Sequence, residues 1–459
     1  MIGFTQFILR IELTPVQIAM LAGVLLVSIY KARPEWILGV YLSMSLWARV
    51  IVVGSIAHTW VLLAALFLAT VHYVHQERRF AFTPEYLRDR TLGIMPRQDR
   101  WVIVWMLLWW GWMLLLLNQF DADEKIAVLR PILLNVIIPM PVILLLARDL
   151  ARLRGFAMAY VLAAVVGCWL ALDVYKIPLS YLLTDPALEG TGLVRLGLRN
   201  YHFFSHFCAI GFILATTLYL DSKSLLKQGL MLLCAAWCAY FLLLAGARQS
   251  MSGAIVCSVL ILLWMIARGG PVRSVRALLL ASVVTAMVIW LYQESPQLII
   301  REDEAGNVAN SFNIFDGRGK LWAIGWGHFL TSPLWGLGFE QTVWSHNLFV
   351  GTLSDQGVIG MIFFVGFLVF VLRRMPAVWM RAEHDPRDLW RVAFFAIFLF
   401  GMIHGMASGN TSSTAHLYWS AAALWWLGQD VPRPAPRQVV QGSVAGQPLL
   451  RVSASAEGQ

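Results

Sequence analysis

Three basic residues stand in polar stretches between long apolar runs and are candidates for chemistry: Arg248, Arg318 and His346. An arginine side chain offers a planar fork of N–H donors that fits two oxygens of a phosphate group. A histidine side chain has an unperturbed pKa of about 6.5, so it can accept a proton at neutral pH. These residue types predict a site that binds an anionic group and moves a proton beside it.

Arg248 lies in a short turn between two apolar runs, and Gln249, Ser250 and Ser252 follow it at the start of the second run. The free N–H groups and the positive dipole end of the second helix would point to the same place as the guanidinium group. The turn therefore predicts an anion site. The alternative is an arginine that reaches the membrane interface without binding a ligand.

Arg318 begins a predicted amphipathic helix over residues 317–331, and Pro333 ends this helix. The apolar residues of the helix, Trp322 among them, predict that it lies on the outer leaflet of a membrane. Arg318 in the first turn would then contact either lipid phosphates or a bound phosphate ligand.

His346 is the strongest single candidate for a proton acceptor. It precedes an apolar run, and Asn347 follows it. Small residues surround it in the sequence and allow helices or a ligand to approach closely; these are Gly336, Gly338, Gly351, Gly357 and Gly360. The alternative is a histidine that caps the helix at the membrane interface.

Other basic residues are weaker candidates. Arg195 and Arg199 are four residues apart, so on a helix they would share a face and reach the same anion; a solvated loop pair is the alternative. His202 and His206 also share a face, but the sequence places no third metal ligand near them. We therefore predict metal-independent chemistry without a cofactor. The remaining histidines are interpreted as having no functional role; they are His58, His72, His75, His328, His384, His404 and His416.

The composition predicts an all-α membrane protein. The chain is 59% hydrophobic and only 13% charged, whereas a soluble domain has about 25% charged residues. Apolar runs long enough to cross a bilayer as helices recur along the whole length. We count thirteen such runs, near residues 16–30, 36–54, 59–74, 101–118, 126–147, 156–172, 203–220, 229–245, 251–267, 277–293, 348–371, 392–408 and 414–428. A group of tryptophans at the start of the fourth run is interpreted as an aromatic belt.

The charges of the loops predict the topology. Basic segments favour the inner side of the membrane, and they include 75–100, 148–154, 221–228, 268–276 and 372–391. Residues 173–202 and 294–345 are predicted to be outer loops. A membrane domain of residues 1–428 would precede a disordered inner tail of residues 429–459. The net charge of +9 follows this loop bias, so no nucleic-acid partner is predicted.

The chain resembles the O-antigen ligase family of bacterial inner membranes, within a superfamily that includes O-antigen polymerases and protein O-oligosaccharyltransferases. The resemblance rests on the turn around Arg248, on Arg318 with Trp322 four residues later, and on a Pro-Leu-x-Gly-x-Gly, His-Asn, Gly-x-x-Gly run over residues 333–360. It covers about residues 195–410. The run over residues 333–360 is typical of the whole superfamily and does not separate a ligase from a polymerase.

The resemblance implies a fold and a reaction. The fold would have about twelve transmembrane helices and a large periplasmic loop, as in C-type glycosyltransferases, with both termini cytoplasmic. The reaction would move a glycan from undecaprenyl pyrophosphate to a sugar hydroxyl of the lipid A core, within the membrane lipid and at the periplasmic face. Arg248 and Arg318 would hold the pyrophosphate, and His346 would be the base. Arg195 or Arg199 would be an auxiliary phosphate contact, and Asn347 and Trp322 would contact the substrate.

Two groups of alternatives remain open at this point. An O-antigen polymerase or a protein O-oligosaccharyltransferase would use the same donor with another acceptor. A transporter or flippase would need ionisable groups deep inside the spans, at matched positions of two halves. Arg49 is the main charge of that kind in the sequence.

Overall fold

The computed structural model describes the chain in segments. These are residues 11–12, 15–47, 51–53, 56–78, 100–117, 132–147, 149–174, 201–245, 247–268, 270–294, 301–302, 308–309, 318–338, 345, 347–373, 387–407 and 414–427. All of them belong to one compact unit, Met1–Gly428. Arg49 and the predicted tail over residues 429–459 lie outside the described residues.

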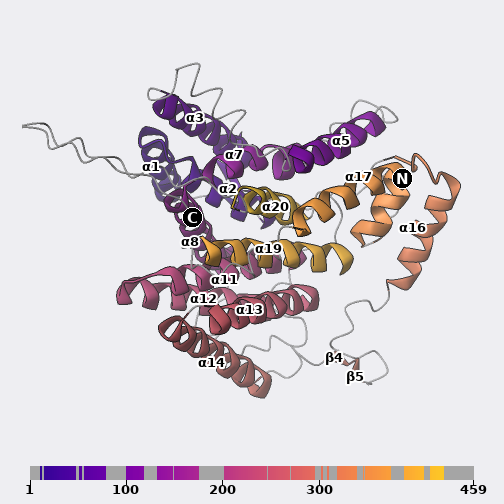
Figure 1. The fold of residues 1–459 in the computed structure, drawn as a ribbon. Coiled ribbons are helices and arrows are strands. Elements are labelled where there is room, and N and C mark those ends of the chain that lie inside the picture. Colours follow the sequence, from indigo (N-terminus) through magenta and orange to yellow (C-terminus); the bar gives the residue numbers. More distant parts are fainter. Residues whose placement is uncertain are drawn as a thin grey trace, which may run out of the picture. The chain divides into compact units, whose positions relative to one another are not determined.

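The predicted all-α architecture is confirmed, because a helix lies in each of the thirteen apolar runs (Figure 1). The first runs form α1 (Pro15–Tyr30), α2 (Pro34–Trp47), α3 (His58–Arg78), α5 (Arg100–Leu116), the π-helix η4 (Leu133–Ile137) with α7 (Pro139–Leu146), and α8 (Leu150–Val174). The later runs form α11 (Tyr201–Asp221), α12 (Leu225–Leu244), α13 (Arg248–Arg268), α14 (Pro271–Glu294), α17 (Leu348–Leu372), α19 (Asp388–Ala407) and α20 (Ala415–Leu427).

Strands make a minor contribution to the fold. β1 (Ile11–Glu12) pairs in parallel with β2 (Ile51–Val53), and β2 pairs antiparallel with β3 (Ile56–Ala57). β4 (Arg301–Glu302) and β5 (Val308–Ala309) form a separate antiparallel pair. Each strand has only two or three residues, so the helices carry the architecture.

Seven of the described helices are long and apolar enough to cross a membrane: α8, α11, α12, α13, α14, α17 and α19. Shorter apolar helices occur within α1, α3, α5 and the η4–α7 segment. The predicted total of twelve spans stays a prediction. Among the long helices α11 is the most enclosed, with 94% of its apolar window buried, so it lies at the centre of the bundle.

Polar contacts tie the basic segments together at one end of the helices. Arg154 at the start of α8 pairs with Asp221 at the end of α11, and Trp390 at the start of α19 also donates to that carboxylate. Arg276 in α14 donates to the Ser222 carbonyl oxygen over 2.9 Å. These residues belong to, or directly adjoin, segments that the positive-inside rule places on one side of the membrane. The arrangement agrees with the predicted alternation of the helices.

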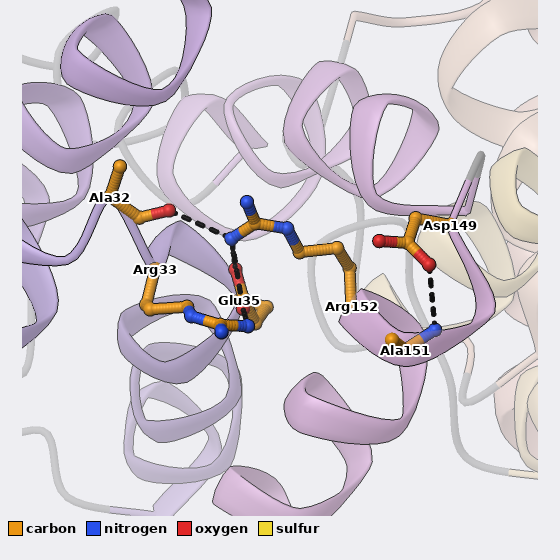
Figure 2. A network of polar contacts seen from close by, with 6 residues as sticks. All are labelled: Ala32, Arg33, Glu35, Asp149, Ala151 and Arg152. Carbon is orange, nitrogen blue, oxygen red and sulfur yellow. Dashed lines mark hydrogen bonds and ion pairs between the residues drawn. The ribbon is translucent and has the colours of Figure 1, made fainter. Parts of the chain in front are cut away.

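A buried acid links α2 to α8 in the first part of the chain (Figure 2). Glu35 at the start of α2 is fully buried and accepts from Arg152 in α8 over 3.0 Å and from Arg33 over 3.2 Å. Arg152 also donates to the Ala32 carbonyl oxygen and lies over the ring of Tyr73 in α3. A buried carboxylate needs such partners, because the loss of its hydration is otherwise uncompensated.

Candidate active site

The first turn of α13 meets two other helices at the end opposite the basic contacts. Ser250 in α13 lies with its Oγ 2.8 Å from the Oγ of Ser205 in α11. Gln249 accepts a hydrogen bond from Arg318 through its Oε1, over 3.3 Å. Both Gln249 and Ser250 are buried. The structure therefore brings Arg318 to the helix start that carries Arg248, although the Arg248 side chain lies outside the described residues.

The predicted amphipathic helix exists as α16 (Gly319–Thr331), with Arg318 as its N-terminal cap residue. Gly325 lets this helix approach the start of α17 closely. A Cβ atom added there would lie 2.7 Å from Cγ1 of Val350 and 3.3 Å from Cβ of Ser345. Trp322, one turn after Arg318, is partly exposed. Because α16 packs here, Arg318 belongs to the same end of the molecule as the segment around residue 346.

The residues on both sides of His346 are held firmly. Asn347 caps α17 by accepting from the backbone N–H groups of Phe349 and Val350 over 2.9 and 3.1 Å. Its Nδ2 donates to the carbonyl oxygen of Met406 in α19 over 3.0 Å. Ser345 donates from its hydroxyl to the Asn347 carbonyl oxygen. The predicted substrate contact of Asn347 stays a prediction, but its amide already has a structural role.

The Pro-Leu-x-Gly-x-Gly segment packs against a break in α17. At Gly357 the backbone leaves the helical conformation, with φ 65° and ψ −168°. The N–H groups of Leu337 and Gly338 donate to carbonyl oxygens of the turn before the break, over 2.9 and 3.0 Å. The N–H of Val358 returns a bond of 2.8 Å to the Pro333 carbonyl oxygen. The broken helix therefore fixes the segment that follows α16.

Two tryptophans of α5 complete this arrangement. Trp109 donates from Nε1 to the Gln356 side-chain oxygen over 2.9 Å, and Trp112 donates to the Gln356 carbonyl oxygen over 3.0 Å. Trp112 also stacks on Trp335, with ring centroids 5.2 Å apart. The interpretation as an aromatic belt is wrong for Trp109 and Trp112, because both are buried and bonded to α17. Their spacing on one helix face is the only sequence signal.

Three histidines that the sequence interpretation left without a shared role meet in the core. They are His206 of α11, His404 of α19 and His416 of α20, and all are buried. The ring centroids of His206 and His404 are 3.6 Å apart, and His416 lies 5.7 and 5.6 Å from them. The sequence did not predict this cluster, and the interpretation of His404 and His416 as residues without a functional role is not tested by the contact. Within the described part of the chain, no three His, Cys, Asp or Glu side chains are arranged to hold a metal ion.

Several predicted site residues cannot be placed. His346, Arg195 and Arg199 lie outside the described residues, and their roles stay predictions. In the described geometry, Arg318 at the start of α16 contacts the first turn of α13. Gly325 of the same helix packs against Ser345 and Val350, which lie on either side of Asn347 in the sequence. Such an arrangement places a guanidinium group beside the N-terminus of a helix, a combination that suits an anionic ligand.

The helices and this polar end define a multi-pass membrane protein with a candidate anion site. Residues 233–365 match the O-antigen ligase family. The match includes Arg248, Arg318 and His346, so it confirms the predicted resemblance on the segments that carry the candidate site. It supports a membrane enzyme of the O-antigen ligase and polymerase type. A comparison with curated proteins gives no match.

Proposed function

We propose that the chain is an O-antigen ligase of the bacterial inner membrane, with its site on the periplasmic side. Its donor would be a glycan on undecaprenyl pyrophosphate, and its acceptor would be a sugar hydroxyl of the lipid A core. The fold would be that of a C-type glycosyltransferase with about twelve spans. The contact between Arg318 and the first turn of α13 is the observation that carries the proposal.

In this proposal Arg248 and Arg318 bind the two phosphates of the donor. The start of α13 adds its free backbone N–H groups and its positive dipole end to the same anion. Charge that develops on the leaving pyrophosphate is stabilised most by donors that are already oriented before the reaction. Gln249 holds the Arg318 guanidinium group in such an orientation. Arg195 or Arg199 would add an outer contact, and Trp322 would contact the donor beside Arg318.

His346 acts as the general base. It takes the proton of the acceptor hydroxyl, whose oxygen attacks the anomeric carbon while the bond to the pyrophosphate oxygen breaks. One displacement of this kind inverts the anomeric configuration. The assignment of the base is supported by the bonds of Asn347 and Ser345, which fix the backbone on both sides of His346. We expect the transfer to proceed without a metal ion.

The base is tested with purified protein, a lipid-linked glycan donor and a lipid A core acceptor. His346→Ala should lower the transfer rate by about 10²- to 10⁴-fold, because a positioned base contributes that much. The matched control is His328→Ala, which removes another histidine from the adjoining segment of the chain. Full transfer by His346→Ala would refute the role of the base.

The anion site is tested by binding of undecaprenyl pyrophosphate itself. Arg248→Ala and Arg318→Ala should each weaken binding by about tenfold or more, because charge-assisted hydrogen bonds contribute about 1.5–3 kcal/mol. Lys320→Ala is the control for Arg318, since it removes an exposed cation two residues away. Arg268→Ala is the control for Arg248, since it lies at the other end of α13. Unchanged affinity in both site variants would exclude the proposed anion site.

The acceptor separates this proposal from related activities. With truncated lipid A core as the sole acceptor, a ligase transfers glycan and a polymerase does not. A pilin-like protein acceptor tests for a protein O-oligosaccharyltransferase. Flux of the lipid-linked donor across vesicles without glycosyl transfer would instead support the transporter or flippase alternative, which the family match disfavours.

A further inference from the structure

The cluster formed by His206, His404 and His416 lies beside both described halves of the candidate site. On one side, His206 adjoins Ser205, whose hydroxyl contacts Ser250 in the first turn of α13. On the other side, His404 lies two residues before Met406, whose carbonyl oxygen binds the cap residue of α17. The cluster is therefore the layer that joins α11, α19 and α20 beneath the candidate site.

Close packing encloses this layer. The ring of Phe400 lies 5.8 Å from that of His206 and 5.2 Å from that of His416, measured between centroids. Gly253 allows α13 to approach Phe400, because an added Cβ atom would come within 2.8 Å of that ring. Gly405 likewise allows Leu348 at the start of α17 to approach α19. A change in the spacing of the three imidazole rings would therefore shift α13 and α17 as well.

Protonation changes the number of hydrogen-bond donors and acceptors that the three imidazole rings offer. A neutral imidazole has one N–H donor and one nitrogen acceptor, whereas an imidazolium has two donors and no acceptor. Three neutral rings together bring three donors and three acceptors, and one added proton turns these into four donors and two acceptors. In a buried layer the added charge loses its hydration, which costs free energy. Uptake of a proton therefore works against the packed arrangement.

Other ionisable groups lie on the helices that surround the cluster. Asp221 and Arg268 end α11 and α13, and Asp388 and Arg391 begin α19, more than ten residues from the cluster along each helix. The nearer groups are Cys208 on α11, Cys257 on α13, Asp355 on α17 and Tyr418 on α20, whereas Tyr219 of α11 lies thirteen residues from His206. The side chains of Arg248 and His202 lie outside the described residues.

We propose that His206, His404 and His416 are positioning residues of the site. While neutral they hold the Arg318 half and the Asn347 half together, and uptake of a proton by the cluster separates the halves and stops transfer. The claim that protonation stops glycan transfer rests on the proposed function. The claim that the neutral cluster holds the two halves together does not rest on it, so glycan transfer and stability are measured separately.

The transfer reaction is measured as kcat/KM against pH in the wild type and in the triple variant H206Q/H404Q/H416Q. Glutamine keeps one donor group and one acceptor but takes up no proton. Protons on His346 and on the cluster should each reduce activity, giving about a hundredfold loss per pH unit at the acid limit of the wild type. The triple variant should lose only about tenfold per unit. His72→Gln, which replaces a half-buried histidine of α3 outside the cluster, should keep the wild-type slope.

Thermal unfolding of the same proteins against pH tests the cluster without any glycan substrate. The midpoint temperature of the wild type should fall between pH 8 and pH 5, because proton uptake favours the unfolded state, and it should fall less in the triple variant. If the triple variant does not fold, amide hydrogen exchange of the wild type replaces it. Peptides from α11, α19 and α20 should then exchange faster at pH 5 than at pH 8, after correction for intrinsic rates.

The outcomes are distinct for the two proposals. Absence of glycan transfer at every pH, together with the expected shift in the unfolding temperature, would overturn the proposed function and keep the role of the cluster in packing. Equal acid slopes and equal unfolding shifts in wild type and triple variant would overturn the cluster proposal. The cluster proposal would also be overturned if His72→Gln reduced the acid slope and the unfolding shift as much as the triple variant does. Hydrogen exchange in α11, α19 and α20 that does not respond to pH would overturn it as well.

Discussion

The break in α17 allows a quantitative prediction, because the backbone at Gly357 has no room for a side chain. With φ 65° and ψ −168°, it occupies a region that is nearly restricted to glycine, and another residue there costs about 1–3 kcal/mol. An added Cβ atom would also lie 2.3 Å from the Leu334 carbonyl oxygen, and such overpacking costs about 1–3 kcal/mol. Gly357→Ala should therefore lower the free energy of unfolding by about 2–6 kcal/mol.

Denaturant unfolding of the detergent-solubilised protein measures this change. The matched control is Gly327→Ala in α16, where nothing lies within 4 Å of an added Cβ atom. Alanine at a helical position is expected to be more stable than glycine by about 0.5–1 kcal/mol. The two substitutions add the same methyl group, so their difference isolates the conformation and the close approach at Gly357.

The same substitution should reduce glycan transfer more than its effect on folding explains. The segment after α16 is bonded across the break, so loss of the bonds from Leu337 and Gly338 would release α16 and with it Arg318. Equal stability of Gly357→Ala and Gly327→Ala would refute the reasoning, because it would mean that residue 357 does not need its left-handed conformation.

Two smaller perturbations test the neighbouring contacts. Asn347→Ala removes the cap of α17 and the bond to Met406, and should lower the thermal stability by about 1–2 kcal/mol; Asn347→Asp keeps the capping acceptor and should recover part of this loss, and equal losses would argue against capping. Trp112→Phe keeps an aromatic ring but removes the donor to the Gln356 carbonyl oxygen, and should cost about 1 kcal/mol in denaturant unfolding. Trp326→Phe on the exposed face of α16 is its control, and an equal loss there would remove the claim for a specific bond.

The helices could be predicted because each apolar run carries its own signal. Pro333 and the apolar pattern after Arg318 were likewise sufficient to predict α16, which begins two residues later than predicted and ends at Thr331 as expected. These signals are local, since helix formation depends on residues within a few turns.

The contacts between runs could not be predicted in the same way. A glycine within an apolar run is compatible with an unbroken helix, and Gly357 became a break only through the approach of residues 333–338. His206 is separated from His404 by nearly half of the chain, so no spacing rule connects them. The sequence predicted Arg248 and Arg318 as one site. The structure places Arg318 against Gln249, the residue after Arg248, while the Arg248 side chain lies outside the described residues and its role stays a prediction.

The buried Glu35 has a consequence for biosynthesis. Its partner Arg152 follows 117 residues later in the chain, and at about 5–20 residues per second the ribosome needs roughly 6–23 s to deliver it. During that interval Arg33 is the nearby cation available to the carboxylate. Until α8 arrives, the carboxylate therefore depends on the half-exposed Arg33 and lacks the more deeply buried partner that later encloses it.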